Sequence, residues 1–286
     1  MSRWLVLVGA AMLQAGCVGV PSPLAPGLEG SVGVPHFGSQ TAAVQLPVAG
    51  KGFVRYRPHG HNYWGLPRLV KLVSEAAAHV ARVAPDGAPL LVGDLSARYG
   101  GKIPGHNSHR SGRDVDLLLF VTTPAGVPRE SPGFVAIDGD GLGFVEGTSE
   151  YVRLDVEREW LLIKHLVSAP DASVQFLFLS QKLEALLIDY ALARGEPLEV
   201  IHRAQTVLMQ PTDSTPHDDH IHLRLACAPS EAVSGCSGGG PHWEWFPESD
   251  RAPELDAAEL ARIAEDDPLQ GSVSAKNEVD GVPGGV

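Results

Sequence analysis

The sequence is poor in cysteine, methionine and basic residues. It contains three cysteines and three methionines among 286 residues. Three cysteines are too few for a scaffold built from disulfides, or for a structural zinc site made only of cysteine. Lysine and arginine total 22 against 34 acidic residues, which gives a formal net charge of -12. Such a charge repels phosphate backbones and anionic lipid surfaces, so we expect no nucleic-acid partner.

The remaining composition is that of a globular protein. Hydrophobic residues make up 44% of the chain and charged residues 20%. This balance excludes a disordered or fibrous chain, and the length allows one sizeable hydrophobic core. Histidine is comparatively abundant, with 12 residues. The places where histidines cluster are therefore the first candidates for a functional site.

The first 16 residues have the order of an export signal. Arg3 precedes an apolar run from Trp4 to Leu13, and small residues follow up to Cys17. The run is too short to remain as a membrane-spanning anchor. The residues before Cys17 resemble a bacterial lipoprotein signal, in which cleavage leaves the cysteine to carry a lipid. We expect a lipoprotein-type signal peptide over residues 1–16 and a lipid on Cys17, with an ordinary secreted protein as the alternative.

The other two cysteines would then reach an oxidising compartment. Cys227 and Cys236 are nine residues apart in a loop that contains Gly, Ser and Pro. The loop can bring them together, so we favour a disulfide over a pair of free thiols. A catalytic cysteine is less favoured than either, because neither cysteine lies beside a histidine cluster.

Hydrophobic periodicity predicts one α+β domain. We expect helices over residues 66–83, 156–167 and 181–194, and strands over residues 89–94, 114–121, 174–179 and 218–226. Apolar residues recur every three or four positions in the first helix, and they alternate with polar ones in the last strand. Strands and helices are mixed without a repeated βαβ pattern, which favours the α+β class.

Composition divides the chain into four parts. After the signal, residues 17–45 are rich in Gly, Pro, Ser and Val and predict a tether that leads into an irregular arm. Residues 46–246 form the predicted domain. Residues 247–286 carry ten acidic side chains against three basic ones. We expect this acidic tail to be largely disordered, with some helix near residues 255–263.

Two segments concentrate histidine and aspartate. They are GHNSHRSGRDVD at residues 105–116 and HDDHIH at residues 217–222. Alternate residues of a strand point to the same face, so His220 and His222 should share one face of the last strand. Taken singly, a histidine in a turn is usually surface decoration, and a His-x-His pair on a strand can be structural. The joint occurrence of the two segments in an exported chain favours a functional centre.

The first segment can supply the carboxylate of such a centre. Asp114 and Asp116 share a face for the same reason, and His109 lies in a turn from which it can fold back over Asp116. Two imidazoles and one carboxylate on adjacent strands make a three-ligand set that leaves one zinc position open. An open zinc site suits hydrolysis of an unactivated amide.

These segments and their flanks resemble the penicillin-insensitive murein endopeptidase family. That family belongs with lysostaphin, the D-alanyl-D-alanine metallopeptidases and the hedgehog domain. The resemblance includes QLPVAGKGFVRYRPHGHNYWG, PLLVGDLSARYGGKIPGHNSH, DVEREWLLIKHLV and HWEWF in the same order, and it extends from roughly Val48 to Phe246. It implies a single domain with a central, mainly antiparallel sheet flanked by helices, as in the hedgehog and D-alanyl-D-alanine peptidase folds.

The resemblance also assigns roles to residues. It implies that zinc is bound by His109, Asp116 and His222. The implied catalytic histidines are His220, which would face the attacking water or the developing oxyanion, together with His217 and His106. Asp114 would orient a ligating histidine. Arg224 is either a structural partner or the group that holds a substrate carboxylate. The family also has a disulfide loop after the last motif, in agreement with a Cys227 to Cys236 pair.

The implied activity is zinc-dependent hydrolysis of the D-alanyl to meso-diaminopimelyl crosslink of peptidoglycan. It implies a periplasmic enzyme whose partner is peptidoglycan and which touches the membrane only through a lipid anchor. The alternatives are a zinc D,D-carboxypeptidase acting on stem peptides, and a non-catalytic, zinc-containing wall-binding lipoprotein. No serine stands in a nucleophile-elbow or Ser-x-x-Lys setting. We therefore expect the protein to be insensitive to penicillin.

Overall fold

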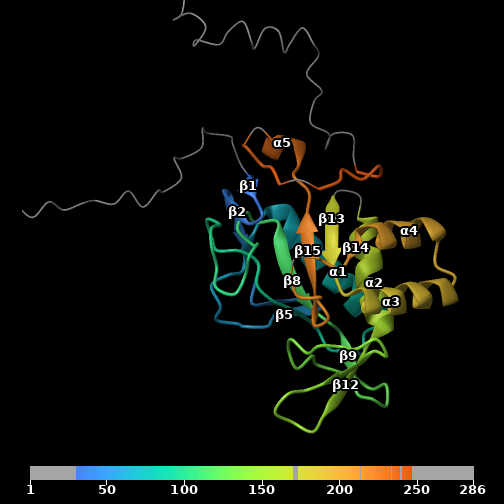
Figure 1. Ribbon diagram of the computed structural model, residues 1–286. Helices are drawn as coiled ribbons and strands as arrows, with labels where there is room; N and C mark the ends of the chain where they lie inside the picture. Colours follow the sequence, from blue (N-terminus) through green and yellow to red (C-terminus); the bar gives the residue numbers. More distant parts are fainter. Residues whose placement is uncertain (1–29, 170–172, 213, 233, 239, 247–286) are drawn as a thin grey trace, which may run out of the picture. The chain divides into compact units, whose positions relative to one another are not determined.

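A computed structural model describes residues 30–169, 173–212, 214–232, 234–238 and 240–246 (Figure 1). These residues all belong to one compact unit. The export signal, Cys17 and the acidic tail with its expected helix lie outside the described residues. Within the described ranges, every helix is too short or too polar to cross a membrane.

The fold is built around a central sheet of seven strands in the order β14-β13-β15-β8-β7-β5-β4 among the described residues. The bounds are β4 (Ala49–Gly50), β5 (Phe53–Arg55), β7 (Leu90–Val92), β8 (Asp114–Leu118), β13 (Val174–Phe178), β14 (Leu208–Met209) and β15 (His220–Leu225). The pairs β5-β7 and β13-β14 are parallel, and the other neighbouring pairs are antiparallel. The α+β class with a mainly antiparallel sheet is therefore confirmed.

Helices cover one face of this sheet. They are α1 (Pro67–Val83), α2 (Val156–Ser168), α3 (Gln181–Ala193) and α4 (Leu198–Val207), while the short α5 (Pro229–Ala232) lies in the loop that follows β15. Figure 1 shows α1 and α2 behind β8, β15 and β13. Leu117 of β8 and Leu223 of β15 are fully buried in the same core cluster as Leu69 of α1 and Leu162 of α2. The opposite face of β8 and β15 is left for polar side chains.

The strongly periodic helices lie within one or two residues of their predicted positions. Helix α4, which the sequence analysis did not predict, has only three buried residues in ten. Two smaller sheets were also not predicted. They are formed by β9 (Val121–Thr122), β10 (Pro128–Arg129), β11 (Leu142–Phe144) and β12 (Tyr151–Leu154), and by β3 (Val44–Gln45) with β6 (Trp64–Gly65). Strands of two to four residues are too short to show a hydrophobic period.

Residues 31–40 form a hairpin instead of an irregular arm. Strand β1 (Ser31–Val34) pairs antiparallel with β2 (Phe37–Gln40). Gly33 also accepts from the backbone nitrogen of Ser237 at 3.0 Å and donates to the carbonyl of Gly235 at 2.9 Å. The hairpin is therefore held by residues far away in the sequence, which a local pattern cannot reveal. The prediction of a tether and irregular arm is therefore wrong for residues 31–40, which form a hairpin.

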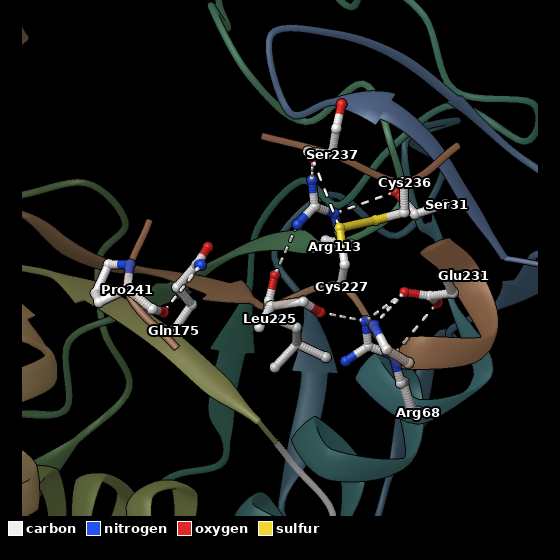
Figure 2. Close-up of a disulfide and its surroundings, with 12 residues drawn as sticks. Ser31, Arg68, Arg113, Gln175, Leu225, Cys227, Glu231, Cys236, Ser237 and Pro241 are labelled. Atoms are coloured by element: carbon white, nitrogen blue, oxygen red, sulfur yellow. Dashed lines mark hydrogen bonds and ion pairs between the residues drawn. A yellow bond between two sulfur atoms is a disulfide. The ribbon is translucent and has the colours of Figure 1, made fainter. Parts of the chain in front are cut away.

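The favoured disulfide is present between Cys227 and Cys236 (Figure 2). It closes the loop that follows β15 and that contains α5. Arg68 of α1 donates to the carboxylate of Glu231 at 2.9 Å and to the carbonyl of Ala226 at 2.5 Å. The loop is thus fixed both by a covalent bond and by a partly buried ion pair to the first helix.

Arg113 connects three parts of the chain at this position. Its side chain is 1% exposed, and it donates to Ser31 Oγ at 3.1 Å, to the Leu225 carbonyl at 3.2 Å and to the Ser237 carbonyl at 2.6 Å (Figure 2). Burial lowers its pKa to about 10, so it stays charged at neutral pH. Arg113 therefore joins the start of β8 to the hairpin, to the end of β15 and to the disulfide loop.

Glu159 of α2 is a fully buried carboxyl group. Its Oε2 accepts a hydrogen bond from the Phe120 backbone nitrogen at 2.9 Å. Burial raises its pKa from 4.5 to about 8. Between these two values the folded protein holds a proton that the unfolded chain has lost. The free energy of unfolding should therefore fall as the pH rises from 4.5 to about 8.

Replacing this carboxyl by an amide should remove that dependence. In Glu159→Gln the amide oxygen can still accept from Phe120 and no proton is gained or lost. Between about pH 5 and pH 7.5, the wild type should lose up to about 3 kcal/mol more unfolding free energy than the variant in urea titrations. Glu157→Gln, an exposed change on the same helix, is the control. Equal losses in wild type and Glu159→Gln would contradict the assignment.

Candidate metal centre

The register between β8 and β15 brings the two sequence segments together. Asp116 pairs with His222, and Asp114 pairs with Arg224. His220 shares the face of His222 because it is two residues away on the same strand. The intervening side chains point the other way into the core. The polar face therefore carries one carboxylate opposite a histidine and a second carboxylate opposite an arginine.

His109 reaches this face from the preceding turn. Its backbone has a φ of 62°, a left-handed conformation that is uncommon for a residue other than glycine. Its Nδ1 donates to the Leu95 carbonyl at 2.7 Å, and its backbone nitrogen lies 3.3 Å from Asp114 Oδ2. These bonds direct the other ring nitrogen, Nε2, to a point 3.1 Å from Asp116 Oδ1. The turn thus folds back over the strand as its position in the sequence suggested.

Two imidazole nitrogens lie close to one carboxylate oxygen of Asp116. The Oδ1 atom of Asp116 lies 3.1 Å from His109 Nε2 and 3.4 Å from His222 Nδ1. The side chains of all three residues are almost fully buried. His109 Nε2 and Asp116 Oδ1 make no hydrogen bond of normal geometry to any described residue. Buried polar atoms are almost always satisfied, so this His-Asp-His cluster is compatible with a metal ion.

Asp114 fixes the orientation of His222. Its Oδ1 lies 2.9 Å from His222 Nε2 and accepts from Arg224 Nε at 2.6 Å. Burial alone would raise the pKa of Asp114, but Arg224 and His222 lower it far below its usual value. The group is therefore a carboxylate that accepts the Nε2 proton of His222. Burial and the neighbouring His109 lower the pKa of His222 to about 4, so its Nδ1 is free to face Asp116.

His220 and His217 form a second histidine group beside the cluster. His220 Nε2 lies 3.4 Å from Asp116 Oδ1, and its Nδ1 lies 2.5 Å from Asp219 Oδ1. Burial would lower the pKa of His220, but the bonds to both aspartates raise it to about 9. His217 donates from Nδ1 to the Thr215 carbonyl at 2.8 Å, and its ring centre is 4.9 Å from that of His220. The structure thus places both of these histidines at the centre.

His106 lies near the other carboxylate oxygen of Asp116. Its Nδ1 is 3.7 Å from Asp116 Oδ2, and its Nε2 is 3.1 Å from Asp94 Oδ2. Asp94 was not predicted as a site residue, although it comes two residues after the buried strand β7. Phe134 was also missed. Its ring centre lies 5.2 Å from that of His220, and the sequence around it carries no signal for this contact.

The histidine groups line an open cleft of about 700 Å³. Its walls are formed by His36, Gly105, His106, Asn107, Ser108, Asp116, Phe134, Phe178, Pro211, Ser214, Thr215, His217, His220, His222 and Arg224. Buried His109 lies beneath this surface. A cleft of this volume can admit several residues of a peptide, and it brings them directly to the His-Asp-His cluster.

Comparison with known proteins identifies the family. A family model described as penicillin-insensitive murein endopeptidase matches residues 31–242. The chain belongs to this family. Penicillin-insensitive murein endopeptidases of Escherichia coli K12 and Shigella flexneri serotype 5b are each 30% identical to it over 231 residues, which cover 77% of this chain and 78% of theirs. A relative from Escherichia coli O139:H28 is 30% identical over 203 residues, or 71% of this chain and 68% of its own.

Membership of the murein endopeptidases makes the chain a peptidoglycan hydrolase, as the resemblance predicted. The match begins at the β1-β2 hairpin, so the family segment includes residues that composition alone placed in the tether. It also contains both motif segments in full. The cleft and its histidine groups thus lie within the part of the chain that is common to these murein endopeptidases.

The contact between Asp114 and His222 predicts a role in metal retention. Asp114→Asn keeps an acceptor for His222 but removes the negative charge that favours the Nε2-protonated ring. We expect the affinity for Zn²⁺ to fall by about 10- to 100-fold. The measurement is competition for Zn²⁺ against a chromophoric chelator. Asp140→Asn, the same change at an exposed position, should bind like the wild type, and an unchanged affinity for Asp114→Asn would refute the role.

Proposed function

We propose that this murein endopeptidase is a zinc enzyme that hydrolyses the D-alanyl to meso-diaminopimelyl crosslink. The observation that carries the proposal is the convergence of His109 Nε2, Asp116 Oδ1 and His222 Nδ1 below the cleft, with two of these atoms buried and unsatisfied. The proposed ion, bond specificity and catalytic roles go beyond family membership. Each can be tested on the purified protein.

Zinc suits the donor set. The ligands of a tetrahedral zinc ion with bonds near 2.0–2.1 Å are separated by roughly 3.3 Å. The observed separations from Asp116 Oδ1 are 3.1 Å to His109 Nε2 and 3.4 Å to His222 Nδ1. Two imidazoles and one carboxylate favour zinc over calcium or magnesium, which prefer oxygen ligands. When bound, zinc polarises a carbonyl group and lowers the pKa of water towards neutrality.

The remaining histidines supply proton transfer and charge stabilisation. His220 faces the centre through Nε2, while Asp219 holds its Nδ1. With its raised pKa, this imidazole holds a proton at neutral pH and can donate it to the leaving amine. When protonated, it can also stabilise the negative charge that develops on the attacked carbonyl oxygen. His217 packs against His220, and His217 and His106 both line the cleft, so both can contact the substrate near the reacting bond.

We also propose that the mature protein is a periplasmic lipoprotein. The order of charge, apolar run and small residues before Cys17 supports export and lipidation. Peptidoglycan lies outside the cytoplasmic membrane, so its hydrolases have to be exported. The Cys227 to Cys236 disulfide fits an oxidising compartment. Mass spectrometry of the membrane fraction tests this proposal: an unmodified Cys17, or an uncleaved signal, would reject the lipid anchor.

A muropeptide digest tests the activity. The zinc-loaded protein should convert crosslinked dimers to monomers and leave the terminal D-alanine of pentapeptide monomers in place. A chelator should abolish the reaction, and added Zn²⁺ should restore it, with liquid chromatography and mass spectrometry as the readout. Release of D-alanine from monomers would indicate a D,D-carboxypeptidase instead. Intact dimers after digestion with zinc-loaded protein would indicate a non-catalytic wall-binding protein.

Removing the proposed proton-transfer group gives a second test. His220→Ala should lower kcat by about 10²- to 10⁴-fold while the zinc content stays near the wild-type value, because His220 is not a proposed ligand. Turnover of a crosslinked dimer and metal analysis on the same sample provide the two readouts. His59→Ala at an exposed position is the control. Wild-type turnover by His220→Ala would remove this residue from the mechanism.

A further inference from the structure

Arg224 stands out among the residues that line the cleft. It lies on β15 two positions after His222 and on the same face. Among the described residues of the cleft wall, it is the one lysine or arginine. The rest of the wall is formed by histidines, the carboxylate of Asp116, small residues, a proline and two phenylalanines. The cleft wall therefore has a single guanidinium among its described residues, next to the His-Asp-His cluster.

The guanidinium of Arg224 is hydrogen-bonded through Nε, whereas its two terminal nitrogens remain accessible. Its Nε donates to Asp114 Oδ1 at 2.6 Å, and its central carbon lies 5.2 Å from the centre of the Phe178 ring. The two terminal nitrogens have no hydrogen-bond partner among the described residues. The side chain is 17% exposed, whereas Asp114 is fully buried. Asp114 and Phe178 thus fix the group while its terminal donors remain available to the cleft.

Arg224 is close enough to the cluster to reach a group beside the reacting bond. Its Nε and the Nε2 of His222 both contact Asp114 Oδ1, at 2.6 and 2.9 Å. The arginine is therefore separated from this ring by a single shared oxygen atom. The opposite nitrogen of the same ring faces Asp116. A substrate group that contacts Arg224 therefore lies beside His222, on the same face of β15 as the proposed reaction centre.

The proposed substrate carries a carboxylate in this place. In the crosslink, the scissile amide nitrogen is bonded to a carbon of the diaminopimelyl residue that also bears a carboxylate. That carboxylate is two bonds from the scissile nitrogen. The planar guanidinium of arginine matches a carboxylate with two parallel N–H donors, which lysine cannot reproduce. The chemistry of the open end of Arg224 therefore matches the charged group nearest to the bond that breaks.

We propose that Arg224 binds the carboxylate adjacent to the scissile bond and makes the enzyme select crosslinks in which this carboxylate is free over those in which it is amidated. The proposal rests on the proposed function of the same site. A solely structural Arg224 would neutralise Asp114 and leave the preference unaffected. Loss of the arginine would then slow both substrates equally, so the ratio between substrates distinguishes the two roles.

The experiment compares two purified crosslinked dimers that differ only in that carboxylate, which is free in one and a carboxamide in the other. The wild-type enzyme should cleave the free form with a kcat/KM at least about tenfold higher, the scale of one charge-assisted hydrogen bond. In Arg224→Gln, which can still donate to Asp114, the ratio should fall close to one. Arg224→Lys should retain part of the preference for the free carboxylate, because it keeps the positive charge but loses the two parallel N–H donors.

The matched control is Arg203→Gln. Arg203 of α4 also has a carboxylate partner, Glu199 at 2.6 Å, and lies over the ring of Trp245. It does not line the cleft, so the variant should keep the wild-type ratio. Zinc content and circular dichroism show whether each variant is folded. If Arg224→Gln does not fold, the role of Arg224 is tested by comparing the wild type with Arg224→Lys, using the ratio of kcat/KM for the free and amidated dimers.

Two results would overturn the role of Arg224. One is equal cleavage of both dimers by the wild type. The other is a wild-type ratio between the two dimers in Arg224→Gln. If Arg224→Gln does not fold, a wild-type ratio in Arg224→Lys has the same meaning. Failure of the proposed function is recognised separately, because the wild type would then cleave neither dimer. A low kcat for both substrates with an unchanged ratio would assign Arg224 to the support of Asp114 alone.

Discussion

Strands β8 and β15 pair so that Asp116 lies opposite His222 and Asp114 lies opposite Arg224. Every contact of the centre depends on this register. A shift by one residue would move the polar side chains into the core and the leucines to the cleft, which the burial of Leu117 and Leu223 forbids. The hydrophobic core therefore specifies the geometry of the polar face. The chemistry of the site is fixed by apolar packing on the other side of the same two strands.

This register also explains how two similar histidines acquire different environments. The side chains of His220 and His222 lie on the same face of β15. Their positions in the sequence do not show which of the two contacts both Asp114 and Asp116. The structure places His222 opposite Asp116, with Asp114 behind it, and places His220 opposite Leu118 with Asp219 as its partner. The His222 ring lies between Asp114 and Asp116, whereas the somewhat more exposed His220 ring lies between Asp116 and Asp219. His220 and His222 are only two residues apart on the strand, yet they have different hydrogen-bond partners.

The sequence predicted those features that depend on local periodicity or on alternation along a strand. Helices α1, α2 and α3 and strand β15 have strong patterns, and the two motif segments could be placed on facing strands. The contact of His106 with Asp94 and that of His220 with Phe134 could not be predicted. Both depend on the paths of long loops, which are set by tertiary packing. The same holds for α4 and for the β1-β2 hairpin, whose partners are distant in the sequence.

The hairpin has a consequence for the order in which the domain can form. Gly33 at its centre bonds with Gly235 and Ser237, roughly 200 residues later in the chain. Closing so large a loop costs entropy that is recovered only when the intervening strands are already in place. A chain synthesised from its N-terminus presents β1 before the rest of the described domain, yet this strand cannot complete its contacts until the disulfide loop has followed. The first strand of the domain to emerge is thus among the last to be secured.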